Sequence, residues 1–177
     1  MNQYCIDMHV HTGEVSPCGR VKARKVVRMY HEAGYHGIVI TDHFYDGFFE
    51  SLTGLTWTQK IDRFLHGYRE AAEEGSKIGL YVLLGAEFRF PENFNDYLIY
   101  GLDTDFLYKH PKLYSLGLNH FSKQLADTDI LIYQAHPFRA GIVPADPLLI
   151  QGVEVFNGNP RHDSRNHLAY QYAAEHR

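Results

Sequence analysis

Cysteine is scarce in this chain, with two residues among 177. The low count excludes a small scaffold stapled by disulfides and is compatible with a reducing cytoplasm. Long apolar runs are also lacking, because no stretch approaches the roughly 18 consecutive apolar residues of a membrane span. The N-terminus lacks the charged start and apolar run of a signal peptide. These absences predict a cytoplasmic protein that does not enter a membrane.

Basic charge is not in excess either. The chain has 17 Lys and Arg against 21 Asp and Glu, a net charge of −4, with no basic block. It is therefore not expected to bind long nucleic acid. The apolar fraction of 45% argues against disorder, and the length fits a single domain over residues 1–177. Histidine is abundant instead, with twelve residues.

Short apolar runs alternate with amphipathic stretches along the chain. The expected strands are 4–8, 38–41, 80–86, 97–102, 130–135 and 153–156. They show no polar alternation, which is typical of parallel strands covered on both faces. The expected helices are 21–33 ending at Gly34, 58–74 capped by Thr56 or Thr58 and ending at Gly75, one within 113–126, and one from about Ser164 onwards. The order predicts an α/β fold with one parallel sheet, open or barrel-like.

Side chains that can bind metals recur where the expected strands end. They are Asp7, His9, His11, Asp42, His43, Glu87 and His136. Residues two apart on a strand point to the same side, and the C-terminal ends of parallel strands gather on one face. Burying this many polar groups without a partner would cost several kcal/mol. A centre of divalent Zn, Mn or Fe is therefore expected, whereas the other eight histidines are expected to be ordinary hydrogen-bonded residues.

Five short segments resemble, in order, the motifs of the PHP (polymerase and histidinol phosphatase) family. They are Asp-Met-His-Val-His-Thr at 7–12, Thr-Asp-His at 41–43, Gly-Ala-Glu at 85–87, Ala-His-Pro at 135–137 and Gly-Val-Glu-Val-Phe-Asn at 152–157. The resemblance covers nearly the whole chain. It implies a distorted TIM-like barrel of seven β/α units with two or three divalent metal ions at its rim. It also implies phosphoesterase activity through a metal-activated water.

The resemblance assigns roles to the residues that match the motifs. His9 and His11 would bind a first metal, Glu87 would bridge the first and second, and His136 would bind the second. A further ligand to the second metal is usually a histidine of the strand that corresponds here to 97–102. In this sequence Asp103 is the preferred substitute and Asp96 the second choice, since a carboxylate can replace an imidazole on such metals.

The remaining roles are also implied by the resemblance. His43 would bind a third metal, with Cys18 as its other ligand, although a packed free thiol remains an alternative for Cys18. Asp7 and Asp42 would orient the ligating imidazoles. Arg139 is the first candidate for holding a phosphate and Arg20 the second, the alternative for both being a solvated surface arginine. Glu154 is interpreted as mainly structural.

The family's last motif, an Asp-x-His after a final strand, has no counterpart after Glu154. The resemblance thus implies an incomplete barrel of about six strands, C-terminally short by its last β/α unit. Because an uncovered strand tends to pair with a neighbour, either a homodimer through this C-terminal edge or an exposed edge is expected.

The predicted activity is hydrolysis of a small phosphorylated metabolite or of a nucleotide or oligonucleotide phosphoester. A non-catalytic PHP module with a structural or regulatory role is the alternative. An amidohydrolase ranks last, because those enzymes usually carry a metal-bridging lysine at a strand end and no lysine ends a strand here.

Overall fold

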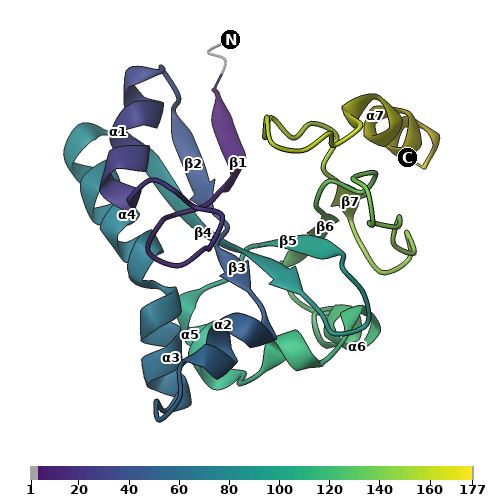
Figure 1. The fold of residues 1–177 in the computed structure, drawn as a ribbon, viewed down its shortest axis with the longest axis horizontal. Helices are drawn as coiled ribbons and strands as arrows, with labels where there is room; N and C mark the ends of the chain where they lie inside the picture. Colours follow the sequence, from purple (N-terminus) through teal and green to yellow (C-terminus); the bar gives the residue numbers. More distant parts are fainter. Residues whose placement is uncertain (1–3, 177) are drawn as a thin grey trace.

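The computed structural model describes residues 4–176, in which the strands form one curled sheet (Figure 1). Its order is β1-β2-β4-β5-β6-β7, and β3 pairs with β4 beside this path. The strands are β1 Ile6–Val10, β2 Gly37–Ile40, β3 His43–Phe44, β4 Tyr81–Arg89, β5 Asp96–Tyr100, β6 Leu131–Gln134 and β7 Gly152–Val153. The curl makes a half-barrel, which confirms the expected α/β class and the incomplete TIM-like barrel.

The sheet is mixed, because β5 runs antiparallel to both β4 and β6. Residues 90–95 alone separate β4 from β5. A parallel crossover needs a dozen or more residues, so this short connection closes a hairpin. The expectation of one parallel sheet is therefore wrong at β5. As a consequence, the start of β5 lies beside the end of β4, with Asp96 opposite Arg89.

Helices cover the outside of the sheet. They are α1 Ala23–Glu32, α2 Asp46–Ser51, α3 Trp57–Phe64, α4 His66–Ile78, α5 Thr104–Lys109, the 3₁₀ turn η1 Leu113–Ser115, α6 Leu118–Gln124 and α7 Asn166–Glu175. In Figure 1, α1 and α4 lie side by side, and they pack against β2 and β4. The helices α2, α3 and α5 lie below the sheet, and α7 lies beyond β7. The sequence pattern had not predicted the short elements β3, α2 and α5.

Helix ends follow the expected signals with one exception. Gly34 adopts a φ of 81° just after α1, and Thr56 begins α3 with a capping box. The expected helix over 58–74 is two helices, α3 and α4. Its expected end at Gly75 is wrong, because α4 continues to the left-handed Gly79, whose φ is 82°.

Buried apolar side chains form two clusters among the described residues. The smaller one joins α1 and α4 to β1 and β2, through residues such as Val27 and Ile38. In the larger one Phe44 of β3 stacks on Phe88 of β4, with ring centroids 4.2 Å apart. The residues before them, His43 and Glu87, are paired across the same two strands. The aromatic stack therefore positions two of the expected metal ligands.

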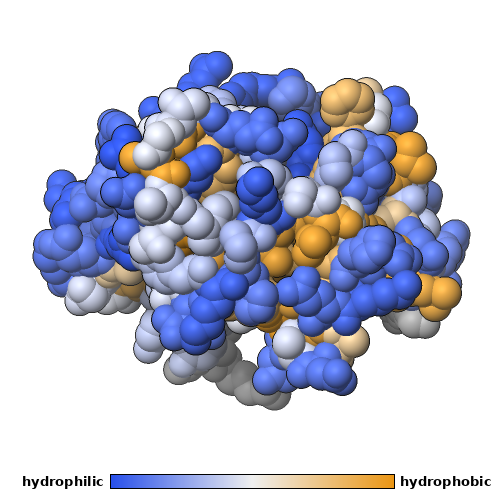
Figure 2. Space-filling model, turned by 90° about the horizontal axis from the view of Figure 1, so that it is seen from below, coloured by the Kyte–Doolittle hydropathy of each residue, from blue (hydrophilic) through white to orange (hydrophobic). Residues whose placement is uncertain are grey.

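The surface is mostly hydrophilic in the view from below, with hydrophobic side chains in separate patches (Figure 2). No helix within residues 4–176 is long and apolar enough to cross a membrane. Within the same residues β7 pairs with β6 alone, and Phe156 just beyond it is 72% exposed. The homodimer through this edge stays a prediction.

Candidate metal centre

Four imidazoles surround one buried carboxylate at the rim of the half-barrel. Glu87 is 1% exposed, and its Oε1 lies 3.3 Å from His9 Nε2 and 3.2 Å from His136 Nε2. Its Oε2 lies 3.2 Å from His11 Nε2 and 2.9 Å from His43 Nδ1. The structure therefore brings together five residues that the sequence placed at separate strand ends.

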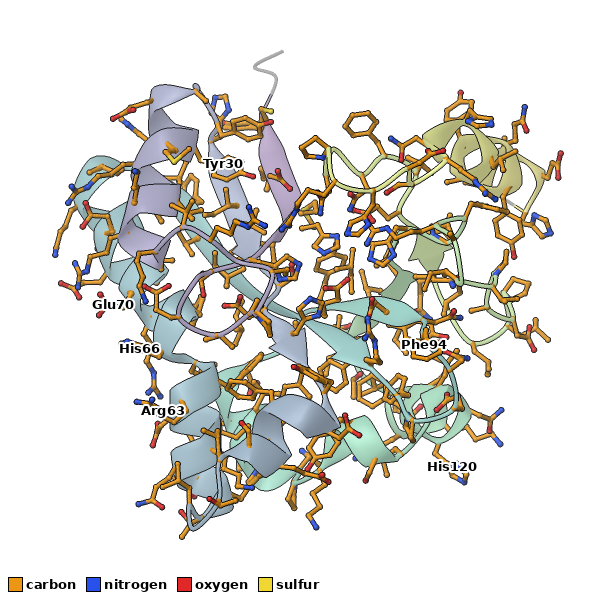
Figure 3. The ribbon with its side chains drawn as sticks, in the orientation of Figure 1. Tyr30, Arg63, His66, Glu70, Phe94 and His120 are labelled. Carbon is orange, nitrogen blue, oxygen red and sulfur yellow. The ribbon has the colours of Figure 1, made fainter. Side chains whose placement is uncertain are left out.

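Histidines outside this group lie elsewhere. In Figure 3, His66 at the start of α4 and His120 on α6 both lie at the periphery, away from the side chains that converge between β1 and β7. His162 is different, because it lines the cleft above the centre, which the sequence did not predict.

The carboxylate and the imidazoles perturb one another. Burial would raise the pKa of the Glu87 carboxyl, but the positive charges of His9 and His43 hold it well below its usual range. Burial would lower the pKa of His43, yet the negative charge of Glu87 raises it to about 10. Burial would also lower the pKa of His9, but the negative charge of Glu87 and the hydrogen bond to Glu154 raise it well above its usual value. Glu87 therefore stabilises positive charge in its surroundings. That charge can be carried by protons on the imidazoles or by a metal ion.

Glu154 orients one of the imidazoles. Its Oε1 lies 2.9 Å from His9 Nδ1, and its Oε2 accepts the backbone N–H of His136 at 2.8 Å. When the Nδ1–H of His9 donates its hydrogen bond to this carboxylate, the lone pair of the neutral imidazole is on Nε2, which faces the centre. Carboxylates orient metal-binding histidines in this way. Glu154 was expected to be mainly structural, but it also orients a candidate metal ligand. Its place in the fifth motif could have indicated this role.

Ser16 orients a second imidazole. Its hydroxyl donates to Asp42 Oδ1 at 2.6 Å and accepts the backbone N–H of His43 at 2.9 Å. A hydroxyl has one proton, so its contact with His11 Nδ1 at 3.1 Å must be a bond that the ring donates. The Nε2 lone pair of His11 therefore also faces the centre. Asp42 acts on this imidazole through Ser16, which the sequence had not indicated.

Asp42 and Asp7 hold the backbone of the ligand loop as well. Asp42 accepts the N–H of Thr12 at 2.7 Å, and burial raises the pKa of its carboxyl although the Ser16 and Thr12 bonds oppose this. Asp7 accepts the backbone N–H of His9 at 3.0 Å and the hydroxyl of Tyr30 at 2.7 Å. The hydrogen bond from His9 to Asp7 thus fixes the backbone at His9 and does not involve its imidazole ring, which differs from the ring-orienting role expected for Asp7.

The donor atoms of the centre fit a divalent ion. The two Nε2 atoms of His9 and His11 lie 3.0 Å apart. When both Nδ1 atoms donate hydrogen bonds, a cation near the two Nε2 atoms relieves the repulsion between their lone pairs. Glu87 Oε2 and His136 Nδ1 are buried without a hydrogen-bond partner among the described residues. Neutral imidazoles with a carboxylate are typical ligands of Zn²⁺, Mn²⁺ and Fe²⁺.

The backbone at His136 is strained. Its φ is 33°, in the region that non-glycine residues rarely adopt. Such conformations cost about 1–3 kcal/mol and cluster at functional sites. Here the bond from the His136 N–H to Glu154 holds the backbone in place.

Asp96, and not Asp103, supplies the carboxylate from β5. Its Oδ2 lies 3.8 Å from His136 Nε2. One carboxylate oxygen each of Asp96 and Glu87 and one ring nitrogen of His43 lie within 4.8 Å of one another, close enough to bind a common ion. Asp103 instead caps α5 by accepting the N–H of Phe106 at 2.6 Å. The preference for Asp103 was wrong because β5 is antiparallel, so its first residue and not its end reaches the rim.

Arg89 secures Asp96 and was missed by the sequence reasoning. Its Nε and Nη2 donate to the two oxygens of Asp96 at 2.8 and 2.7 Å. Burial and the charge of Glu87 raise the pKa of the Asp96 carboxyl, whereas Arg89 opposes this rise. The spacing of Arg89 could have indicated its place at the site. It follows Glu87 by two residues on one strand and therefore points to the same side.

A cleft of about 1080 Å³ lies over the centre and is lined by Arg20, Arg139 and Arg161. The Nη2 of Arg139 donates to Asn157 Oδ1 at 3.3 Å and to Ser164 Oγ at 3.2 Å, while its Nε is buried without a partner in the described part of the chain. Burial lowers the pKa of Arg139. Arg20 is exposed.

Replacing Glu154 with glutamine is expected to weaken metal binding about 10- to 100-fold. Glutamine has one acceptor oxygen, so it can accept from His9 or from the His136 backbone but not from both. Metal titration of the purified variant measures the change, and Glu175→Gln, on an exposed position of α7, is the matched control. An affinity equal to that of the control would show that Glu154 does not orient a ligand.

The family model of the PHP domain matches residues 7–168. The chain belongs to the PHP family. No curated protein matches the sequence. The matched residues of this PHP domain include every member of the metal centre described above.

Solved structures share the fold of this PHP domain. A protein from Bifidobacterium adolescentis with an inferred metal-dependent phosphoesterase function is 18% identical, with a TM-score of 0.55 over 99% of this chain and 85% of that chain. A two-domain protein from Bacteroides vulgatus with a predicted PHP-like phosphoesterase is 16% identical, with a TM-score of 0.65, and this chain covers 48% of it. An amidohydrolase from Chromobacterium violaceum, solved with sulfate and no metal, is 14% identical, with a TM-score of 0.52 over 96% and 82% of the two chains.

Proposed function

We propose that this PHP domain is a metal-dependent phosphoesterase that acts on a small phosphorylated metabolite or on a nucleotide or oligonucleotide phosphoester. The observation that carries the proposal is the buried Glu87, which faces four imidazoles beneath a cleft lined by arginines. Carboxylate and imidazole donors suit a hydrolytic metal, and guanidinium groups suit a phosphate.

His9, His11, Glu87 and His136 would hold the metal, with Asp96, His43 and Cys18 as further ligands for a total of two or three ions. A bound divalent ion supplies hydroxide at neutral pH and polarises a phosphoryl oxygen. The chain's own contribution is to direct the Nε2 atoms of His9 and His11 inward, through Glu154 and Ser16.

Arg139 is the proposed phosphate-binding residue. Arg139 lines the cleft, and Asn157 and Ser164 hold its guanidinium through Nη2, so that the group is fixed where it can donate to a phosphoryl oxygen. A fixed donor of this kind stabilises charge that develops on the oxygens during hydrolysis. Arg20, which also lines the cleft, is the second candidate.

A substrate of modest size fits the cleft. The net charge of −4 does not favour long nucleic acid, whose affinity depends on many phosphate contacts. The cleft is also lined by Ile6, Met8 and Met29, all exposed. These apolar side chains are suited to the organic part of a phosphoester.

The test is metal analysis of the purified protein together with hydrolysis assays on phosphomonoesters, phosphodiesters and amides. Bound transition metal and phosphoester cleavage that stops on chelation and returns with metal are expected. Metal binding without cleavage of any ester would favour the non-catalytic module. Cleavage of amides alone would favour an amidohydrolase, and the lack of both metal and metal-stimulated cleavage would reject the proposal.

A further inference from the structure

A thiol faces the metal centre from the loop between β1 and α1. Cys18 Sγ lies 3.4 Å from His43 Nε2, and one donor atom each of His11, Cys18 and His43 lies within 4.8 Å of the others. A tetrahedral zinc ion with bonds of about 2.3 Å to sulfur and about 2.0 Å to nitrogen places these two atoms roughly 3.5 Å apart. The Cys18–His43 contact, a hydrogen bond between the thiol and the imidazole, therefore also has the spacing of two ligands to one ion.

The loop backbone holds Cys18 in this position. Ser16 N–H donates to Thr12 O at 3.1 Å, and Gly19 N–H donates to Ser16 O at 2.9 Å, which closes the chain tightly around Cys18. A Cβ at Gly19 would lie 2.3 Å from Thr12 O, so only glycine permits the closure. The thiol is thus presented by a packed turn.

A second observation on the same side of the centre also indicates a cation. Glu87 Oε2 is buried without a hydrogen bond of good geometry among the described residues. It lies 3.2 Å from His11 Nε2 and 2.9 Å from His43 Nδ1, the ring nitrogen of His43 that does not face Cys18. These are the two histidines that lie next to Cys18. A cation bound there would compensate a buried negative charge that the described residues leave without a hydrogen bond.

We propose that Cys18 binds the metal centre as a thiolate and makes it selective for zinc over manganese; this inference rests on the proposed metal-dependent function. Imidazole and carboxylate donors accept either ion, whereas sulfur is a soft ligand that favours zinc. The chain's other cysteine, Cys5, is exposed and precedes β1, and it provides a matched control.

Cobalt titration of the metal-stripped protein tests the sulfur ligand by spectroscopy. The wild-type protein and Cys5→Ser are expected to show a near-ultraviolet thiolate-to-cobalt charge-transfer band, and Cys18→Ser is expected to lose it. Competition between Zn²⁺ and Mn²⁺ tests the selectivity. The ratio of the affinity for Zn²⁺ to the affinity for Mn²⁺ is expected to be at least about 10-fold lower in Cys18→Asp than in the wild-type protein.

Thiol alkylation of the wild-type protein provides a readout that needs no variant. Zinc at stoichiometric concentration is expected to protect Cys18 from iodoacetamide, and manganese is not. The inference would be overturned if the cobalt-bound wild-type protein lacked the charge-transfer band. It would also be overturned if Cys18 of the zinc-bound protein reacted with iodoacetamide as fast as it does without metal. Metal-stimulated phosphoester cleavage in that same protein would leave the proposed function standing, whereas no metal binding at all would reject both.

Discussion

Replacing Glu87 with glutamine is expected to abolish the proposed metal binding of this PHP domain and to lower the proposed phosphoester hydrolysis by at least about 100-fold. Glutamine has nearly the same shape but no negative charge. The four imidazoles around position 87 would then lose the charge that draws cations to them, and the pKa of His43 would fall from its raised value. Metal content and the rate of ester cleavage are the measurements.

The control for this variant is Glu50→Gln, which makes the same chemical change at an exposed position of α2. It is expected to keep the wild-type metal content and rate. Unfolding curves of both variants establish that they are folded. A folded Glu87→Gln protein with its full complement of metal would show that the carboxylate is not the centre of the site.

Replacing Phe44 with alanine is expected to lower the free energy of unfolding by about 3–5 kcal/mol. The Phe44 ring is fully buried, stacks on Phe88 at 4.2 Å and packs edge-on against Phe64 at 5.0 Å. Alanine would leave a cavity that these neighbours cannot fill. Because His43 precedes Phe44 on the same two-residue strand, metal affinity is expected to fall as well.

Denaturant unfolding measures this loss, with Phe94→Ala as the matched control. Phe94 is 73% exposed in the loop between β4 and β5, as Figure 3 shows, so its removal is expected to change stability by less than about 0.5 kcal/mol. Similar midpoints for the two variants would contradict the packing described for β3 and β4.

The direction of β5 shows how far the sequence reasoning reached. The apolar run around 97–102 correctly predicts a strand, but its lack of polar alternation favours a parallel strand, whereas β5 is antiparallel. The six-residue segment 90–95 was the better indicator, since it is too short for a crossover. The error carried over to the site, because the direction of the strand decides whether Asp96 or Asp103 reaches the rim.

The sequence by itself determined the α/β class and the set His9, His11, His43, Glu87 and His136. Local patterns are sufficient for this, because apolar runs define strands and the residues that follow them share one rim. The tertiary structure alone decided how these groups are oriented. Glu154 reaches His9 across 145 positions of sequence. A local sequence pattern cannot predict a contact at that separation. The ring nitrogen of His9 that faces the metal centre is therefore decided by the tertiary structure, which brings the residue after β7 next to β1.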